Sequence, residues 1–242
     1  MRYIISDIHG CYDSYMELLK RIGFEDTDEL YILGDAMDRG PEPIKVMQDI
    51  MERSNVIYIL GNHDFAMYMI MKRLCVEITS ENCESHLTVE DMESYQMWLL
   101  DGGQTTAEQF RKLGRYEQMD MLDYIAEASA YEIVEHDDHT YILVHAGLGG
   151  FSPTRELDDY DLYELIGERV DYTKRYYPDK NVYLVTGHTP TISIPGWEKP
   201  EVYQDNGHIA LDCGCVFGGR LAAFCIETGE VTYVDKIDRD KK

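Results

Sequence analysis

Residues 58–67 read YILGNHDFAM, and the interpretation of the whole chain starts from this stretch. An apolar run ends at Leu60 and is followed, after one glycine, by Asn62, His63 and Asp64. Many ordinary strands also end in a glycine and polar residues at a turn. The stretch alone therefore does not separate a turn from a functional site, and its context has to do so.

Four other runs rich in Ile, Val, Leu and Tyr end in the same abrupt way. With VIYIL at 56–60, they are RYIIS at 2–6, LYIL at 30–33, TYILV at 140–144 and VYLV at 182–185. Short, β-branched runs that end in polar residues are typical of buried strands. Amphipathic helices are predicted between the first of them, over 12–23 and 42–54.

This alternation predicts an α/β fold, in which helices pack on the faces of a sheet. Functional groups in such sheets gather beyond the carboxyl ends of the strands. One strand that ends in polar residues is a turn, whereas five such strands favour a converging site. We therefore interpret GNHD at 61–64 as part of a site.

The remaining segments add to this sheet system. Residues 65–130 are helical in pattern and rich in Met and Tyr, which predicts a helical insert whose methionine and aromatic stripe is core packing. The C-terminal part, from 208 to 234, reads as strands joined by a tight ETGE turn, which predicts an antiparallel addition. Residues 1–242 contain no linker or repeat, so a single domain is expected.

Composition excludes several classes of partner. The chain has 46 Asp and Glu against 22 Lys and Arg, a formal net charge of -24. Such a surface repels nucleic-acid backbones and anionic lipid, so neither is an expected partner. A bound divalent cation could still attract an anionic substrate to one cleft.

The location and the thiols follow from similar arguments. No secretory signal precedes RYIIS, and no stretch approaches the roughly 20 apolar residues that span a bilayer, so a cytoplasmic protein is expected. The six cysteines are then expected to be reduced and buried. One residue separates the cysteines of CGC at 213–215, a spacing that disfavours structural zinc.

The strand ends supply candidate metal ligands and catalytic groups. They are Asp7, His9, Asp35, Asp38, Arg39, Asn62, His63, His145 and His188. Oxygen and imidazole donors without cysteine suit manganese, iron(II) or zinc. This is too many groups for one ion, and two ions would need a bridging carboxylate, for which Asp35 is the candidate.

The ordered motifs DIHG, GDAMDRG, GNHD, HAG and GHTP, between residues 7 and 190, resemble those of the metallophosphoesterases. More narrowly, the chain is similar to the phosphoprotein phosphatase branch, which includes small bacterial and phage serine/threonine phosphatases. DGG at 101–103 is similar to the Asn-Gly-Gly of that branch, and LDCGCVFGGRL at 211–221 is similar to its closing strand. The resemblance implies two mixed β-sheets packed as a sandwich and flanked by α-helices.

The resemblance also implies a role for each candidate. The first metal would be held by Asp7, His9 and Asp35, and the second by Asp35, Asn62, His145 and His188. Manganese is the first choice for both ions, with iron or zinc as alternatives. A water activated between the cations would attack phosphorus in line.

Three further residues would handle the substrate. By the resemblance, His63 would protonate the leaving oxygen, Asp38 would orient His63, and Arg39 would hold the phosphoryl oxygens. Small phosphatases often place a second arginine just before Gly-Asn-His, where this chain has Leu60. Arg169 is the candidate replacement, and an arginine exposed on a helix face is the alternative.

Two hydrolase functions are compatible with these motifs. The first is a metal-dependent phosphomonoesterase, a serine/threonine protein phosphatase acting on a phosphorylated protein or a small phosphoester. The alternative is a symmetrical diadenosine tetraphosphate hydrolase, which is similar at DIHGCYD and LGNHD. Such hydrolases usually lack the aspartate of DRG and differ after Gly-His, so Asp38 and GHTP favour the phosphatase. A scaffold without activity and a nucleic-acid end phosphatase remain weaker alternatives.

Other polar residues are not expected to bind metal. His86, His136, His139 and His208 are predicted to be surface histidines, because they lie in polar surroundings away from strand ends. Asp64 is expected to be a structural carboxylate. The acidic run ELDDYDLYE at 156–164 is predicted to be a solvated face.

Overall fold

The computed structural model describes residues 1–77, 79 and 87–238, and it contains two mixed sheets of five strands each. The first sheet has the order β10-β9-β1-β2-β3. Its strands are β1 (Arg2–Ile5), β2 (Glu29–Leu33), β3 (Val56–Ile59), β9 (Arg220–Cys225) and β10 (Val231–Asp235). Strands β1, β2 and β3 run parallel, and β9 and β10 extend the sheet as an antiparallel pair. The predicted antiparallel C-terminal addition is confirmed for β9 and β10, whereas residues 208–210, at the start of the predicted segment, belong to a parallel pair in the second sheet.

The second sheet has the order β4-β5-β6-β8-β7. Its strands are β4 (Tyr131–His136), β5 (His139–Val144), β6 (Val182–Thr186), β7 (Tyr203–Asp205) and β8 (His208–Ala210). Strands β5, β6 and β8 are parallel, while β4 and β7 pair antiparallel at the edges. All five predicted strands are therefore present, and β4, β7 and β8 add to them.

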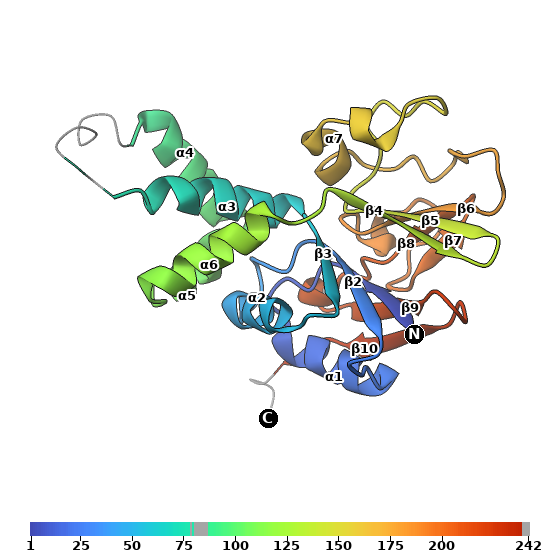
Figure 1. Ribbon diagram of the computed structural model, residues 1–242, viewed down its shortest axis with the longest axis horizontal. Helices are drawn as coiled ribbons and strands as arrows, with labels where there is room; N and C mark the ends of the chain where they lie inside the picture. Colours follow the sequence, from blue (N-terminus) through green and yellow to red (C-terminus); the bar gives the residue numbers. More distant parts are fainter. Residues whose placement is uncertain (78, 80–86, 239–242) are drawn as a thin grey trace.

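The helices cover the outer faces and fill the chain between β3 and β4 (Figure 1). Those beside the first sheet are α1 (Tyr12–Ile22) and α2 (Pro43–Glu52), which confirms both predicted helices. Between β3 and β4 lie α3 (Asn62–Leu74), α4 (Val89–Trp98), the π-helical turn η1 (Leu99–Gly103), α5 (Gln104–Phe110) and α6 (Arg115–Ala126). The short α7 (Leu162–Ile166) lies between β5 and β6. Helices α3 to α6 extend to one side of the sheets in Figure 1. That they form an insert into a single domain stays a prediction.

The two-residue period of the strands places the sheets face to face. Along β1, Ile4 belongs to the cluster shared with Leu143 and Val185 of the second sheet, whereas Ile5 packs with α1 and α2. Along β5, Val144 points to the opposite side, against α7. The order of layers is therefore helices, sheet, sheet and α7, which confirms the predicted sandwich flanked by helices.

Two smaller predictions have different outcomes. His208 is only 1% exposed and bonds through Nε2 to the carbonyl of Lys174 at 2.7 Å, so its prediction as a surface residue is wrong. It lies in β8, whose three residues are all buried. The thiols of Cys11, Cys213, Cys215 and Cys225 are free and buried, as expected. His86 and Cys83 lie outside the described residues.

No helix in the described part of the chain is both long and apolar enough to cross a membrane.

Candidate active site

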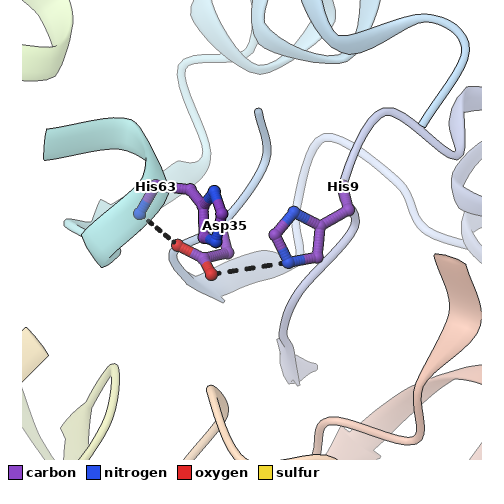
Figure 2. Close-up of side chains that lie close together, drawn as sticks. All are labelled: His9, Asp35 and His63. Atoms are coloured by element: carbon purple, nitrogen blue, oxygen red, sulfur yellow. Dashed lines mark hydrogen bonds and ion pairs between the residues drawn. The ribbon is translucent and has the colours of Figure 1, made fainter. Parts of the chain in front are cut away.

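Asp35 occupies the centre of the site, directly after β2, and is 1% exposed. Its two carboxylate oxygens face different partners: Oδ2 lies 3.5 Å from His9 Nε2, and Oδ1 lies 3.5 Å from His145 Nε2. The backbone N–H of His63 donates to Oδ1 at 3.0 Å (Figure 2). One carboxylate thus faces both halves of the site, which is the geometry expected of a bridging ligand.

The histidines are oriented by bonds to the backbone. His9 bonds through Nδ1 to the carbonyl of Met37 at 2.7 Å, and His145 bonds through Nδ1 to the carbonyl of Leu33 at 2.6 Å. Because a carbonyl only accepts, Nδ1 carries the proton in both rings and Nε2 keeps its lone pair toward the centre. Metal-binding histidines are typically held in this way.

The donor atoms form two groups that share Asp35. His9, Asp35 and His63 make one group, and Asp35, His145 and His188 make the other, each with ligand atoms within 4.8 Å of one another. Asn62, the first residue of α3, joins the second group: its Oδ1 lies 3.0 Å from His145 Nε2 and 2.8 Å from His188 Nδ1.

Burial and neighbouring charges shift the pKa values of the candidate ligands and so determine their protonation. It lowers the pKa of His9 to about 3 and that of His188 to about 4, because a charged imidazole loses its hydration. Burial works to raise the pKa of Asp35, but its three histidine neighbours outweigh this and lower it. Neutral imidazoles beside an ionised carboxylate are the donor set that a divalent cation requires.

Asp7 lies at the end of β1 and is held by other parts of the site. The backbone N–H of His188 donates to both of its oxygens, at 3.1 and 3.0 Å, and the Ser6 hydroxyl donates to Oδ2. Burial raises the pKa of Asp7, and the carboxylates of Asp212 and Asp35 raise it further. Such uncompensated negative charge favours a cation, although the two donor groups above do not include Asp7.

Asp212, which the sequence interpretation missed, is a further buried carboxylate near the site. It follows β8, is 5% exposed, and accepts from the Gly214 amide at 2.9 Å. Burial raises the pKa of Asp212 to about 6, and the charge of Asp35 adds to the effect. The sequence carries the same indication for Asp212 as for the other candidate ligands, because Asp212 is polar and closely follows a parallel strand.

His63 pairs with Asp38 as expected. His63 Nδ1 lies 2.9 Å from Asp38 Oδ2, which leaves Nε2 as the nitrogen that faces outward, 3.6 Å from Asp101 Oδ2. Burial works to lower the pKa of His63, but the bond to Asp38 and the charge of Asp35 outweigh it, so the pKa is raised. A raised pKa keeps the ring protonated over a wider pH range.

Two helical residues hold Asp38 in place. The Trp98 indole N–H donates to Asp38 Oδ2 and the Thr106 hydroxyl donates to Oδ1, both at 2.7 Å. The sequence interpretation missed both, because Trp98 and Thr106 lie in helices whose apolar pattern indicates only packing. Gly103 is needed here, since any Cβ at this position would collide with the Trp98 indole.

Arg39 also reaches the centre. Its Nη1 donates to His9 Nε2 at 2.8 Å, and its backbone N–H donates to the carbonyl of Gly102 at 2.8 Å. Gly102 adopts φ 110° and would collide with Arg39 Cγ if it carried a Cβ. The DGG segment, Asp101 to Gly103, thus positions both Arg39 and Trp98.

Arg169 lies in the loop after α7, and its expected helical setting is wrong. It is exposed, and after burial and His145 its charge contributes to lowering the pKa of His188. The charge of Arg169 therefore acts on His188, whereas Arg39 contacts His9 directly. Asp64 accepts from the amides of Asp35 and Met37 at 2.7 and 3.1 Å and is fully buried, so it is a structural carboxylate.

Several site residues adopt a backbone conformation that costs energy. Those with positive φ are Asp7, His9, Asp35, Asp38, Arg39 and His188, with values from 43° to 66°. Each residue of this kind costs of order 1–3 kcal/mol, and such residues cluster at functional sites. The strain concentrates where the donor atoms converge, which supports a functional role for this edge of the sheets.

Comparison with known proteins defines the class. The model of the calcineurin-like phosphoesterase family matches residues 3–234, and this chain belongs to that family of hydrolases. A bis(5'-nucleosyl)-tetraphosphatase PrpE [asymmetrical] from Geobacillus sp. (strain WCH70) is 30% identical, with 91% of this chain and 88% of that protein covered. A symmetrical bis(5'-nucleosyl)-tetraphosphatase from Erwinia tasmaniensis is 25% identical, with 99% and 98% covered.

A solved structure has a similar fold. A crystal structure provisionally assigned as a diadenosine tetraphosphatase has a TM-score of 0.67 and 19% identity, and covers 98% of this chain and 94% of that one. Between the two functions expected from the motifs, these relatives favour the alternative over the protein phosphatase.

Proposed function

We propose that this protein hydrolyses bis(5'-nucleosyl) tetraphosphates. The observation that carries the proposal is the likeness to such an enzyme over almost the whole of both chains, 30% identical with 91% and 88% covered. The site is consistent with it, because all the donor groups that the motifs indicated, except Asp7, meet around Asp35.

The residues fit a pair of divalent cations, with manganese the first choice and iron or zinc the alternatives. Asp7, His9 and Asp35 would hold one ion. Asp35, Asn62, His145 and His188 would hold the other. Buried imidazoles whose Nε2 atoms face the carboxylate oxygens of Asp35 support this assignment. When bound, the cations would neutralise phosphate charge and lower the pKa of a water molecule.

Side chains of the protein would bind the phosphates and supply the proton. Arg39 and Arg169 would bind phosphate oxygens, since each brings a permanent cation to one side of the centre. His63 would donate a proton from Nε2 to the leaving oxygen, and Asp38 would hold the ring and stabilise its charge. These roles match those that the motifs predicted.

A serine/threonine protein phosphatase is the second candidate, and one observation favours it. A phosphate leaving group is stable as an anion, whereas a serine alkoxide must be protonated as it departs. The buried His63–Asp38 pair, with its raised histidine pKa, provides such a proton donor. That pair is more useful to a phosphomonoesterase than to an enzyme that cleaves phosphoanhydrides.

One comparison tests both candidates. Purified protein with added manganese is assayed with diadenosine tetraphosphate and with a phosphoserine peptide, and each kcat/KM is measured. We expect the dinucleotide to be hydrolysed with the higher kcat/KM, and chromatography then shows whether ADP alone, or AMP with ATP, is formed. A higher kcat/KM for the peptide would reject the proposal in favour of the second candidate. A cytoplasmic location and the absence of nucleic-acid partners stay predictions.

A further inference from the structure

A groove of about 690 Å³ opens beside the active site. It lies between α3 and α4 on one side and α7 on the other, which face each other across the molecule in Figure 1. Its volume falls in the range of small-molecule sites. Asn62 and His63 line one end, so the groove is continuous with the site described above.

The orientation of His63 indicates what enters the groove. Its Nδ1 is engaged by Asp38, and its Nε2 lies 3.6 Å from Asp101, which also lines the groove. A leaving group that departs on the Nε2 side of His63 extends from the centre toward this groove. This step rests on the proposed function of His63.

The lining of the groove is aromatic and flexible. Phe65 and Tyr163 meet edge to face with ring centroids 5.6 Å apart, one from α3 and one from α7. Met69 and Met97, 51% and 69% exposed, add polarisable side chains. Exposed methionine and aromatic side chains together form a surface that suits a flat π-system.

The charges on the groove exclude the phosphate part of a substrate. Of the described residues that line it, none is Lys or Arg, and Glu90, Glu93 and Asp101 supply carboxylates. A polyphosphate would be repelled here and would remain beside Arg39 and the metal ligands. Amino groups of a purine would instead find acceptors in these carboxylates.

We propose that this groove binds the purine base of the leaving nucleotide, so that it selects nucleoside-containing substrates over other phosphoesters and polyphosphates. The base would stack on the Phe65 and Tyr163 side of the groove, while the phosphates lie at the centre. The inference rests on the proposed dinucleotide hydrolysis and names the part of the site that recognises the nucleoside.

The test uses the double variant Tyr163→Ala, Met97→Ala in the full-length protein loaded with manganese. Both side chains are more than two-thirds exposed, so folding should persist. The measured quantity is the ratio of kcat/KM for diadenosine tetraphosphate to that for inorganic tripolyphosphate. We expect this ratio to fall about fivefold or more, through KM, because stacking on an aromatic side chain is lost. The matched control is Tyr116→Ala, an 86% exposed tyrosine of α6 outside the groove, which should keep the ratio.

Two kinetic results would overturn the inference. One is an unchanged ratio in the double variant. The other is a loss confined to a phosphoserine peptide, which would make the groove a peptide site.

A binding measurement separates this inference from the proposed function. Trp98 lines the groove, and Trp197→Phe removes the only other tryptophan of the sequence. Adenosine should then quench the remaining fluorescence, and the double variant should weaken this effect about fivefold or more. If the protein fails to hydrolyse dinucleotides but adenosine still binds in this way, only the substrate proposal falls. If adenosine has no effect, the groove proposal falls whatever the enzyme hydrolyses.

Discussion

The two sheets contribute different chemistry to one site. Each presents three adjacent parallel strands, β1-β2-β3 in the first and β5-β6-β8 in the second, whose carboxyl ends meet. The first sheet supplies Asp35 and the pair His63–Asp38, while the second supplies mainly the imidazoles His145 and His188. In the proposed roles, the bridging carboxylate and the proton donor therefore come from one sheet, and the other sheet would supply further metal ligands.

At the site, the strand ends of the two sheets approach each other at glycines. A Cβ at Gly34 would collide with Gly61 and approach His145, and one at Gly187 would collide with Ser6 and Asp7. The strand ends of the two sheets can therefore meet only because these backbones carry no side chain. Four predictions test how far the division between the sheets holds, beginning with the residue that serves both.

The largest effect is expected from Asp35→Asn. Because its two oxygens face histidines of both sheets, we expect loss of both metals and a fall in kcat/KM of about a thousandfold or more. Metal analysis of protein purified without chelator, together with turnover, measures the two effects. Asp120→Asn, at an exposed aspartate of α6, is the control. Retention of either metal in Asp35→Asn would show that the two sheets hold their ions independently.

His63→Asn should separate catalysis from metal binding within the first sheet. Loss of the proton donor should slow hydrolysis of a phosphoserine peptide about a hundredfold or more, and that of a substrate with an acidic leaving group far less. Bound metal should be unchanged. Metal content is the decisive measurement, because a ligand atom of His63 lies within 4.8 Å of those of His9 and Asp35. If metal is lost together with activity, His63 is a ligand and not the proton donor.

The sequence was sufficient for those parts of the site that follow directly from a parallel strand. Asp7, Asp35 and Asn62 each lie within three residues of a strand end, where the alternation of strands and helices predicts convergence. Trp98 could not be predicted, because its indole N–H reaches Asp38 only through the packing of α4 against the centre, and a tryptophan in a helix indicates core packing.

The elements that were not predicted share a physical reason. In β4, Glu135 lies on the solvated face of this edge strand and Glu132 lies on the opposite face, so the alternation of apolar residues does not show. Strand β8 falls in the segment 208–234 that reads as strands, but His208 was misplaced because its polar neighbours in the sequence do not show that all three residues of β8 are buried. The position of Arg169 could not be predicted, because it lies in the loop after α7, whose path follows from packing on the second sheet and not from local sequence.

Gly187→Ala tests the contact between the sheets. The added methyl group would meet Ser6 and Asp7, so either Asp7 or the His188 loop must move. We expect a loss of about 2–3 kcal/mol in the free energy of unfolding, measured in urea, and weaker metal binding. Gly114→Ala is the control, because its methyl group meets only the tip of Glu117 and should cost less than about 1 kcal/mol. An equal, small effect in both variants would mean that the two strand ends are not tightly apposed.

The smallest effect is expected from Arg169→Ala, which asks whether the second sheet also contributes to substrate binding. Arg169 is exposed, and its charge contributes to lowering the pKa of His188. Because water and salt screen an exposed charge, its interaction with a phosphate is weakened. We therefore expect KM for diadenosine tetraphosphate to rise about three- to tenfold with little change in kcat, and the difference to shrink as salt is added. Arg169→Lys should recover part of the loss, because it restores the charge without the planar fork of donors. If KM is unchanged, Arg169 is a solvated surface residue, and the phosphate is held by Arg39 from the first sheet without a partner arginine on the second.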